Sequence, residues 1–207
     1  LVGRPTVFFS HAWLYTFDHV LNAMRHYVAS LPHGSPEVFF WFDCFSLNQH
    51  STQVFNQQWW STTFMAAIEH INHTVMLVEP WEIPRTLTRA WCLWEVYCTV
   101  ATNTELTLIM TPREKDHYNN VLQQFGPGQV FENLVIDLAN AQGGADDLRM
   151  ILEAAESIEG GIPRLNAIIT ARMFLALQHR PHPPPRSRIL GLGISLEALL
   201  AFDATLE

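Results

Sequence analysis

Charge is scarce in this chain, and lysine most of all. Only 15% of the 207 residues are charged, and Lys115 is the one lysine beside eleven arginines. Residues 38–84 contain neither lysine nor arginine, and the formal net charge is −8. Because nucleic-acid surfaces depend on clustered lysine and arginine, this balance argues against a nucleic-acid partner.

Long hydrophobic runs are also missing. No apolar stretch reaches the roughly 18 residues that a membrane-spanning helix needs, so we expect no membrane span. The first residues, LVGRPTVFF, lack the basic and then apolar pattern of a secretory signal. The chain does not begin with methionine, and we expect it to be part of a longer protein with further domains.

Cysteine is sparse as well. Cys44, Cys92 and Cys98 lie within apolar segments, and their spacing matches no zinc-binding pattern. An odd and small number of cysteines favours reduced thiols, so we expect a cytoplasmic protein. His70 and His73 have the spacing of a ligand pair, but no third ligand is nearby and His73 begins a predicted strand. We therefore predict no metal site.

Apolar and aromatic residues are what the chain has in abundance. They are concentrated early, since all seven tryptophans precede Glu95. This first half is expected to hold a site for chemistry or recognition, or simply a thick aromatic core. Composition alone does not separate the two interpretations.

Predicted strands and helices alternate along the first 178 residues. Short apolar runs predict strands at residues 6–11, 37–45, 73–80, 105–110 and 133–138. Helical spacing and capping signals predict helices at 17–31, 57–71, 86–102, from 112, at 145–158 and at 163–178. Such alternation is typical of an α/β domain with a parallel sheet covered on both faces. Ligands of such sheets bind beyond the carboxyl ends of the strands, which points to the loops 10–13, 43–50 and 79–84.

The remaining residues have a different composition. Residues 179–188 are rich in proline and arginine, which predicts an extended linker. Residues 189–207 are predicted to form a C-terminal helical extension. We therefore divide the chain into a domain at 1–178, the linker and the extension.

Glu95 lies in the apolar helix predicted at 86–102. Leu87, Trp91, Trp94 and Cys98 share its face at helical spacing, and the opposite face is apolar too. Arg89, the one other charge of residues 86–102, lies on the other side. A carboxylate without a local partner is costly to bury, so we expect Glu95 to face a cleft with its pKa raised by desolvation. The alternative is that Glu95 caps a backbone amide or pairs with a distant arginine.

Three segments together resemble a TIR (Toll/interleukin-1 receptor) domain. They are SHAW at 10–13, WFDCFSLNQ at 41–49 and the W-C-L-x-E element at 91–95, and the resemblance covers roughly residues 5–138. It implies a flavodoxin-like three-layer sandwich with a five-stranded parallel sheet. It also implies a signalling domain that self-associates and cleaves the nicotinamide–ribose bond of NAD+. NAD+ would be the substrate, and no cofactor is expected.

The resemblance also assigns roles to residues. Glu95 would be the catalytic carboxylate, and Trp91 would stack on a ring of the substrate or wall the pocket. Ser10, His11 and Trp13 would line the adenine or ribose side. Further along, Asp43 begins the loop that gates the site in TIR domains, and Asn48 would hydrogen-bond the nicotinamide amide.

The chain also departs from the family pattern. Thr6 replaces the usual aspartate before the first strand, and Arg4 is the one basic residue near that strand. Arg85, Arg89 or a helix N-terminus would then have to meet the pyrophosphate.

Two other functions stay open. The chain can instead be a TIR-like scaffold that assembles signalling complexes without catalysis. It can also be an α/β transferase that acts on free nucleosides with a carboxylate at the ribose. Ser10, His11, Asp43 and Trp13 each have a purely structural interpretation as well, as caps, strand ends or core.

Overall fold

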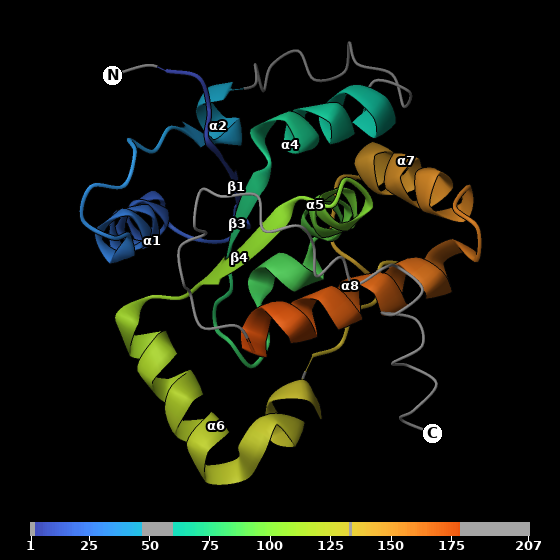
Figure 1. Ribbon diagram of the computed structural model, residues 1–207. Helices are drawn as coiled ribbons and strands as arrows, with labels where there is room; N and C mark the ends of the chain where they lie inside the picture. The colour runs from blue at the N-terminus through green and yellow to red at the C-terminus, as the bar shows by residue number, and fades with distance from the viewer. Residues whose placement is uncertain (1–2, 47–59, 133, 179–207) are drawn as a thin grey trace.

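The computed structural model describes residues 3–46, 60–132 and 134–178. Helices and strands alternate along most of this part (Figure 1). In chain order they are β1 (Val7–Ser10), α1 (Phe17–Ser30), β2 (Phe40–Trp41), α2 (Asp43–Ser46), the π-helix η2 (Trp60–Phe64), α4 (Met65–Ile71), β3 (His73–Leu77), the 3-10 helix η3 (Arg85–Thr88), α5 (Ala90–Ala101), β4 (Glu105–Ile109), α6 (Pro112–Glu132), α7 (Ala145–Glu156) and α8 (Gly161–Gln178).

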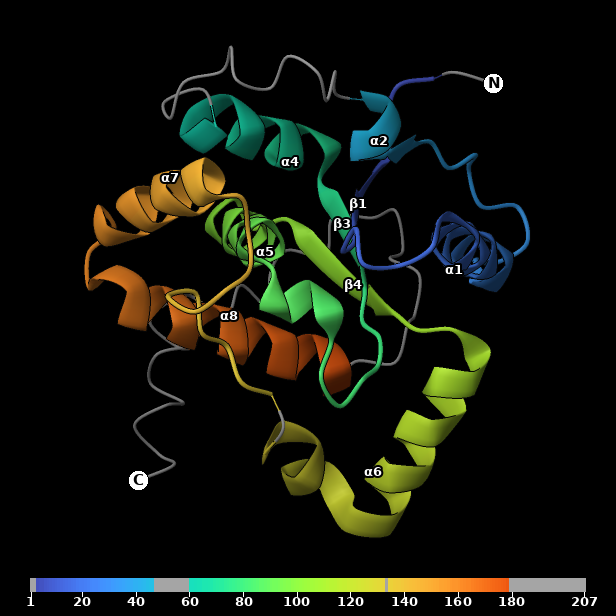
Figure 2. The same ribbon diagram turned by 180° about the vertical axis from the view of Figure 1, so that it is seen from behind.

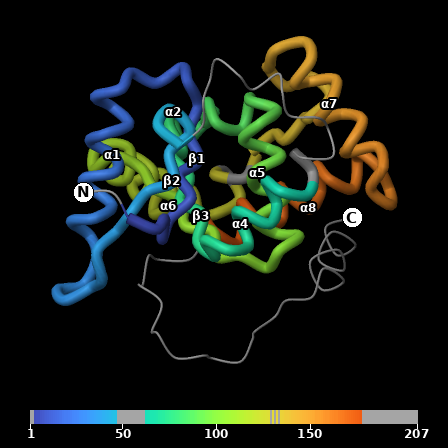
Figure 3. The backbone as a smooth tube through the Cα atoms, turned by 90° about the horizontal axis from the view of Figure 1, so that it is seen from above, coloured from blue at the N-terminus to red at the C-terminus, as the bar shows by residue number. Residues whose placement is uncertain are grey.

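The four strands form one parallel sheet in the order β2-β1-β3-β4. This confirms the predicted α/β class and the parallel sheet. The same order opens the strand sequence of flavodoxin-like sheets. Strands β1 and β3 are central, and β2 lies at the edge together with α2 (Figure 3).

Alternating side chains of the central strands build two cores. Val7 and Phe9 of β1 pack with Val20 and Met24 of α1 on one face of the sheet. Phe8 faces the opposite way, into the larger core that α4, α5, α7 and α8 complete. Views from both sides show α1 on one side of the sheet and α5 on the other (Figures 1 and 2). This period of two is what a strand covered on both faces requires.

The predicted fifth strand at 133–138 is wrong for its described residues. Residues 134–138 form no strand, although Ile136 and Leu138 are buried in the larger core. The Leu138 amide donates to the Asn166 side chain of α8 at 3.2 Å. The Asn166 side chain thus accepts the hydrogen bond that a neighbouring strand would accept if residues 134–138 were in the sheet.

Helix α6 begins at Pro112, as predicted. It runs to Glu132 through a kink at Gly126, whose φ of 77° is non-helical, followed by Pro127. Glycine reaches this φ without steric cost, and proline at the next position restarts the helix. The helix stays attached through Tyr118, whose hydroxyl donates to the Leu177 carbonyl at 3.1 Å.

Two further points concern the predicted boundaries. None of the helices that the structure describes combines the length and hydropathy that a bilayer crossing requires. The predicted linker at 179–188 and extension at 189–207 lie outside the described residues.

Candidate functional site

Glu95 meets Ser10 where α5 crosses the end of β1. The Ser10 hydroxyl, at the last and fully buried position of β1, donates to the Glu95 carboxylate. Glu95 itself is partly buried, on a helix whose neighbouring positions Trp94 and Val96 are buried. No ion pair joins it to an arginine in the part of the chain that the structure describes. No basic side chain of the described residues therefore forms an ion pair with the carboxylate, and burial is the largest influence on its pKa.

The surroundings of Glu95 favour its protonated form. Burial raises its pKa to about 8, the negative charge of Asp43 adds to this, and the hydrogen bond from Ser10 acts against it. The upward pKa shift expected from the apolar helix is thus present. A carboxyl group that titrates near neutral pH is suited to proton transfer or to stabilising a developing positive charge.

Asp43 connects β2 and α2 to the end of β1. Its Oδ2 accepts a hydrogen bond from Trp13 Nε1 at 2.7 Å, and its Oδ1 lies 3.8 Å from His11 Nε2. Burial lowers the pKa of His11, against the opposing effects of Asp43 and of a hydrogen bond to the Phe9 backbone. The imidazole is therefore largely neutral at pH 7.

Trp91 lies one helical turn before Glu95 on α5, as expected from the spacing. Its ring packs edge-on against Phe64 of η2, with 6.0 Å between ring centroids, and it is partly buried. Trp91 thus borders the larger core and keeps part of its surface accessible. Asn48 lies outside the described residues, which leave out positions 47–59.

The structure therefore brings several predicted site residues to one edge of the sheet. Ser10 contacts Glu95, while Trp13 and His11 both face Asp43. These contacts lie at the carboxyl ends of β1 and β2, where parallel sheets bind ligands.

Cys44 and Cys92 belong to the same region, although no role was predicted for either of them. The buried Cys92 thiol donates to the His11 carbonyl at 3.3 Å. Cys44 is exposed beside Asp43, and burial together with the Asp43 charge raises the pKa of its thiol to about 11. Motif spacing does not identify these two cysteines, because the residue that both approach, His11, is distant from them in the chain.

A second group surrounds Glu79, in the loop that follows β3. Its buried carboxylate accepts a hydrogen bond from the Thr111 amide and lies 2.7 Å from His19 Nε2. Arg85 lies over the Tyr15 ring, 5.7 Å from its centroid, and donates to the Leu14 carbonyl at 2.8 Å. A cleft of about 380 Å³ is lined by Glu79, His19, Tyr15 and Arg85 among others.

This cleft contains Arg85, one of the two arginines that were predicted to contact the pyrophosphate. Arg85 is exposed within it, whereas Arg89 is partly buried at the start of α5. Arg85 is therefore the better placed of the two to meet an anionic group. Glu79 and Glu114, which also line the cleft, set a limit on how much negative charge it would accept.

The three sequence segments on which the TIR resemblance was based each supply a residue to this region. Ser10 belongs to the first segment, Asp43 to the second and Glu95 to the third. They come together although 85 positions separate Ser10 from Glu95. Comparisons of the chain with family models, with curated proteins and with solved structures found no match.

Proposed function

We propose that this domain is a TIR-like NAD+ glycohydrolase that cleaves the nicotinamide–ribose bond. The observation that carries the proposal is Glu95, a partly buried carboxylate held by Ser10 at the carboxyl end of β1. The sheet order, which opens like a flavodoxin-like sheet, and the W-C-L-x-E element on α5 support a TIR-like fold.

The proposed reaction breaks the bond between ribose C1′ and the nicotinamide nitrogen. The bonding electrons leave with nicotinamide, which becomes neutral, and the ribose passes through an oxocarbenium-like state. Ionised Glu95 near the ribose stabilises this positive charge. Water then attacks C1′ to give ADP-ribose, or a nitrogen of the adenine ring attacks to give a cyclic product.

The raised pKa of Glu95 fits this role only if substrate binding favours the ionised form. The nicotinamide ring of NAD+ carries a positive charge, which lowers the pKa of a nearby carboxyl group. In the free protein, with its pKa at about 8, Glu95 is mostly protonated at neutral pH. Binding and ionisation are then coupled, and the reaction is expected to be faster above neutral pH.

The test follows nicotinamide release from NAD+ by the purified chain, with and without a crowding agent that promotes self-association. Glu95→Ala is expected to reduce release by roughly 10²–10³-fold, the usual effect of losing a group that stabilises transition-state charge. Glu69→Ala, which removes an exposed carboxylate on α4, is the matched control. Release that survives the Glu95 substitution contradicts the proposed mechanism.

An assembly scaffold is the second candidate, and the exposed aromatic side chains near the site favour it. Trp13, Phe17 and Phe45 are 58%, 50% and 78% exposed, and large exposed apolar groups commonly mark protein contacts. Self-association without nicotinamide release under any condition would support this candidate. Turnover of free nucleosides but not of NAD+ would instead indicate a nucleoside transferase.

A further inference from the structure

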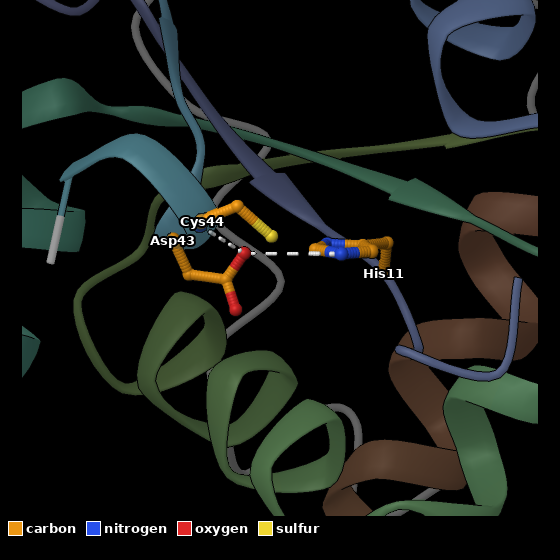
Figure 4. A group of neighbouring side chains, drawn as sticks. All are labelled: His11, Asp43 and Cys44. Atoms are coloured by element: carbon orange, nitrogen blue, oxygen red, sulfur yellow. Dashed lines mark hydrogen bonds and ion pairs between the residues drawn. The ribbon is translucent and has the colours of Figure 1, made fainter. Parts of the chain in front are cut away.

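His11, Asp43 and Cys44 form a cluster of three different metal-ligating side chains. One ligand atom of each lies within 4.8 Å of the other two. The Asp43 carboxylate and the Cys44 sulfur both point toward the His11 ring (Figure 4). They converge on one point although His11 follows β1 and the other two residues begin α2.

We propose that this cluster binds a zinc ion. Histidine nitrogen, cysteine thiolate and a carboxylate oxygen are the three ligand types that zinc takes in proteins. Three protein ligands leave a fourth tetrahedral position for water. We predicted no metal site from the sequence. Motif spacing does not reveal this cluster, because His11 is far from Asp43 and Cys44 in the chain.

The distances are close to those of a tetrahedral site. Bond lengths of about 2.0–2.3 Å place neighbouring ligand atoms of tetrahedral zinc roughly 3.3–3.5 Å apart. His11 Nε2 and Asp43 Oδ1 are already 3.8 Å apart. Cys44 is exposed, and its sulfur lies within 4.8 Å of the other two ligand atoms, so a small movement of its side chain completes the site. On binding, the Cys44 thiol releases its proton to the solvent.

Outer contacts already orient two of the three ligands. Trp13 Nε1 donates to Asp43 Oδ2, while Oδ1 accepts from the Cys44 amide at 2.8 Å and lies on the side of His11. The His11 ring makes a hydrogen bond to the Phe9 backbone. Such outer hydrogen bonds to a ligating carboxylate and a ligating histidine are usual at metal sites in proteins, where they fix ligand orientation. The site therefore needs little rearrangement beyond the Cys44 side chain.

A second cluster, formed by Glu82, Glu114 and His117, provides a comparison. Its ligand atoms also lie close together, and Trp81 contacts two of its three residues. Trp81 donates through Nε1 to His117 Nδ1 at 3.2 Å and through its amide to Glu114 at 3.2 Å. It also offers no thiolate, so His117→Ala serves as the matched control.

The test uses cobalt, because Co²⁺ bound to a thiolate gives a charge-transfer absorption that other sites lack. The whole chain, reduced and treated with a chelator that is then removed, is titrated with Co²⁺ and afterwards with Zn²⁺. We expect a thiolate-to-cobalt band and visible bands of tetrahedral cobalt, both removed by stoichiometric Zn²⁺. His117→Ala should keep them.

Substitution of the ligands gives the outcomes that decide the proposal. Cys44→Ser should abolish the charge-transfer band, and His11→Ala should lower zinc affinity by roughly tenfold or more. Circular dichroism checks that each variant is folded. A wild-type chain without the band, or a Cys44→Ser chain that retains it, overturns the proposal. The readout contains no NAD+, so its outcome is independent of the glycohydrolase test.

Discussion

At the scale of single residues, Glu95 is governed by two neighbours that act in opposite directions. The hydrogen bond from Ser10 favours the ionised carboxylate, and the charge of Asp43 disfavours it. Burial exceeds both effects and raises the pKa of Glu95 to about 8. The sequence predicted this direction from the apolar helix, but not these two interactions, because Ser10 lies in β1 and Asp43 in α2.

Substituting these neighbours should shift the pH profile of nicotinamide release in opposite directions. If ionised Glu95 is the active form, kcat/KM of the wild type rises with pH through a pKa near 8. Asp43→Asn removes the repelling charge and should move the profile to lower pH. Ser10→Ala removes the hydrogen bond and should move it to higher pH. Profiles measured with a metal chelator present check both shifts, and shifts of equal sign contradict the assignment.

Ionisation of Glu95 should also cost folding stability. Its pKa is about 8 in the folded chain against an ordinary value of 4.5, so the folded state holds the proton more tightly than the unfolded state. The resulting stabilisation is full below about pH 4.5 and is lost as the pH rises through 8.

Glu95→Gln cannot ionise, so it should be more stable than the wild type at high pH. We expect a gain in unfolding free energy of at least about 1 kcal/mol at pH 8 and little change at pH 5, since one pKa unit corresponds to about 1.4 kcal/mol. Denaturant unfolding at the two pH values measures this difference. A gain of the same size at both values would indicate a packing effect instead.

At the scale of elements, local signals placed most helices and strands, but the strand predicted at 37–45 was too long: β2 spans only Phe40–Trp41, and α2 begins at Asp43. Helix α1 was predicted at 17–31 and spans Phe17–Ser30, with Thr16 as its N-cap. The strand predicted at 133–138 was wrong, because an apolar run also fits an irregular segment buried under a helix. Such a run joins a sheet only where the edge strand of that sheet is accessible to it. The local sequence pattern does not contain this information.

Thr16 offers a test of how α1 is fixed. Its side chain accepts a hydrogen bond from the His19 amide at 3.3 Å. Thr16→Ala leaves this amide without its cap and should lower the free energy of unfolding by about 1 kcal/mol. Thr16→Ser keeps the oxygen and should lose much less. Equal losses in the two variants, measured by denaturant unfolding, would show that the cap has no part in stability.

At the scale of the whole molecule, exposed apolar side chains gather beside the candidate site. The rings of Phe17 and Phe45 lie edge to face, 6.1 Å between centroids, and Trp13 is exposed on the neighbouring loop. These groups come from the loop after β1, from α1 and from α2. Burial of such side chains between two copies of the chain would place the contact beside Asp43.

Phe45→Ser tests this surface. Loss of a buried phenyl group costs roughly 1.5–3 kcal/mol, so the dissociation constant for self-association should rise by about tenfold or more. Val135→Ser, at another exposed apolar position, is the matched control. Sedimentation velocity over a range of concentrations measures the effect. Unchanged self-association in the Phe45 variant would place the contact elsewhere.

The sequence by itself determined the α/β alternation, the parallel sheet and the unusual position of Glu95 in an apolar helix. These depend on periodicity and on caps, which act between residues a few positions apart. Only the tertiary structure decided that Ser10 meets Glu95 across 85 positions, that Trp13 and His11 meet Asp43, and that Cys44 joins them. It also decided that the described sheet has four strands. Such contacts form when helices pack against the sheet and bring distant segments together. A sequence pattern within one segment therefore cannot predict them.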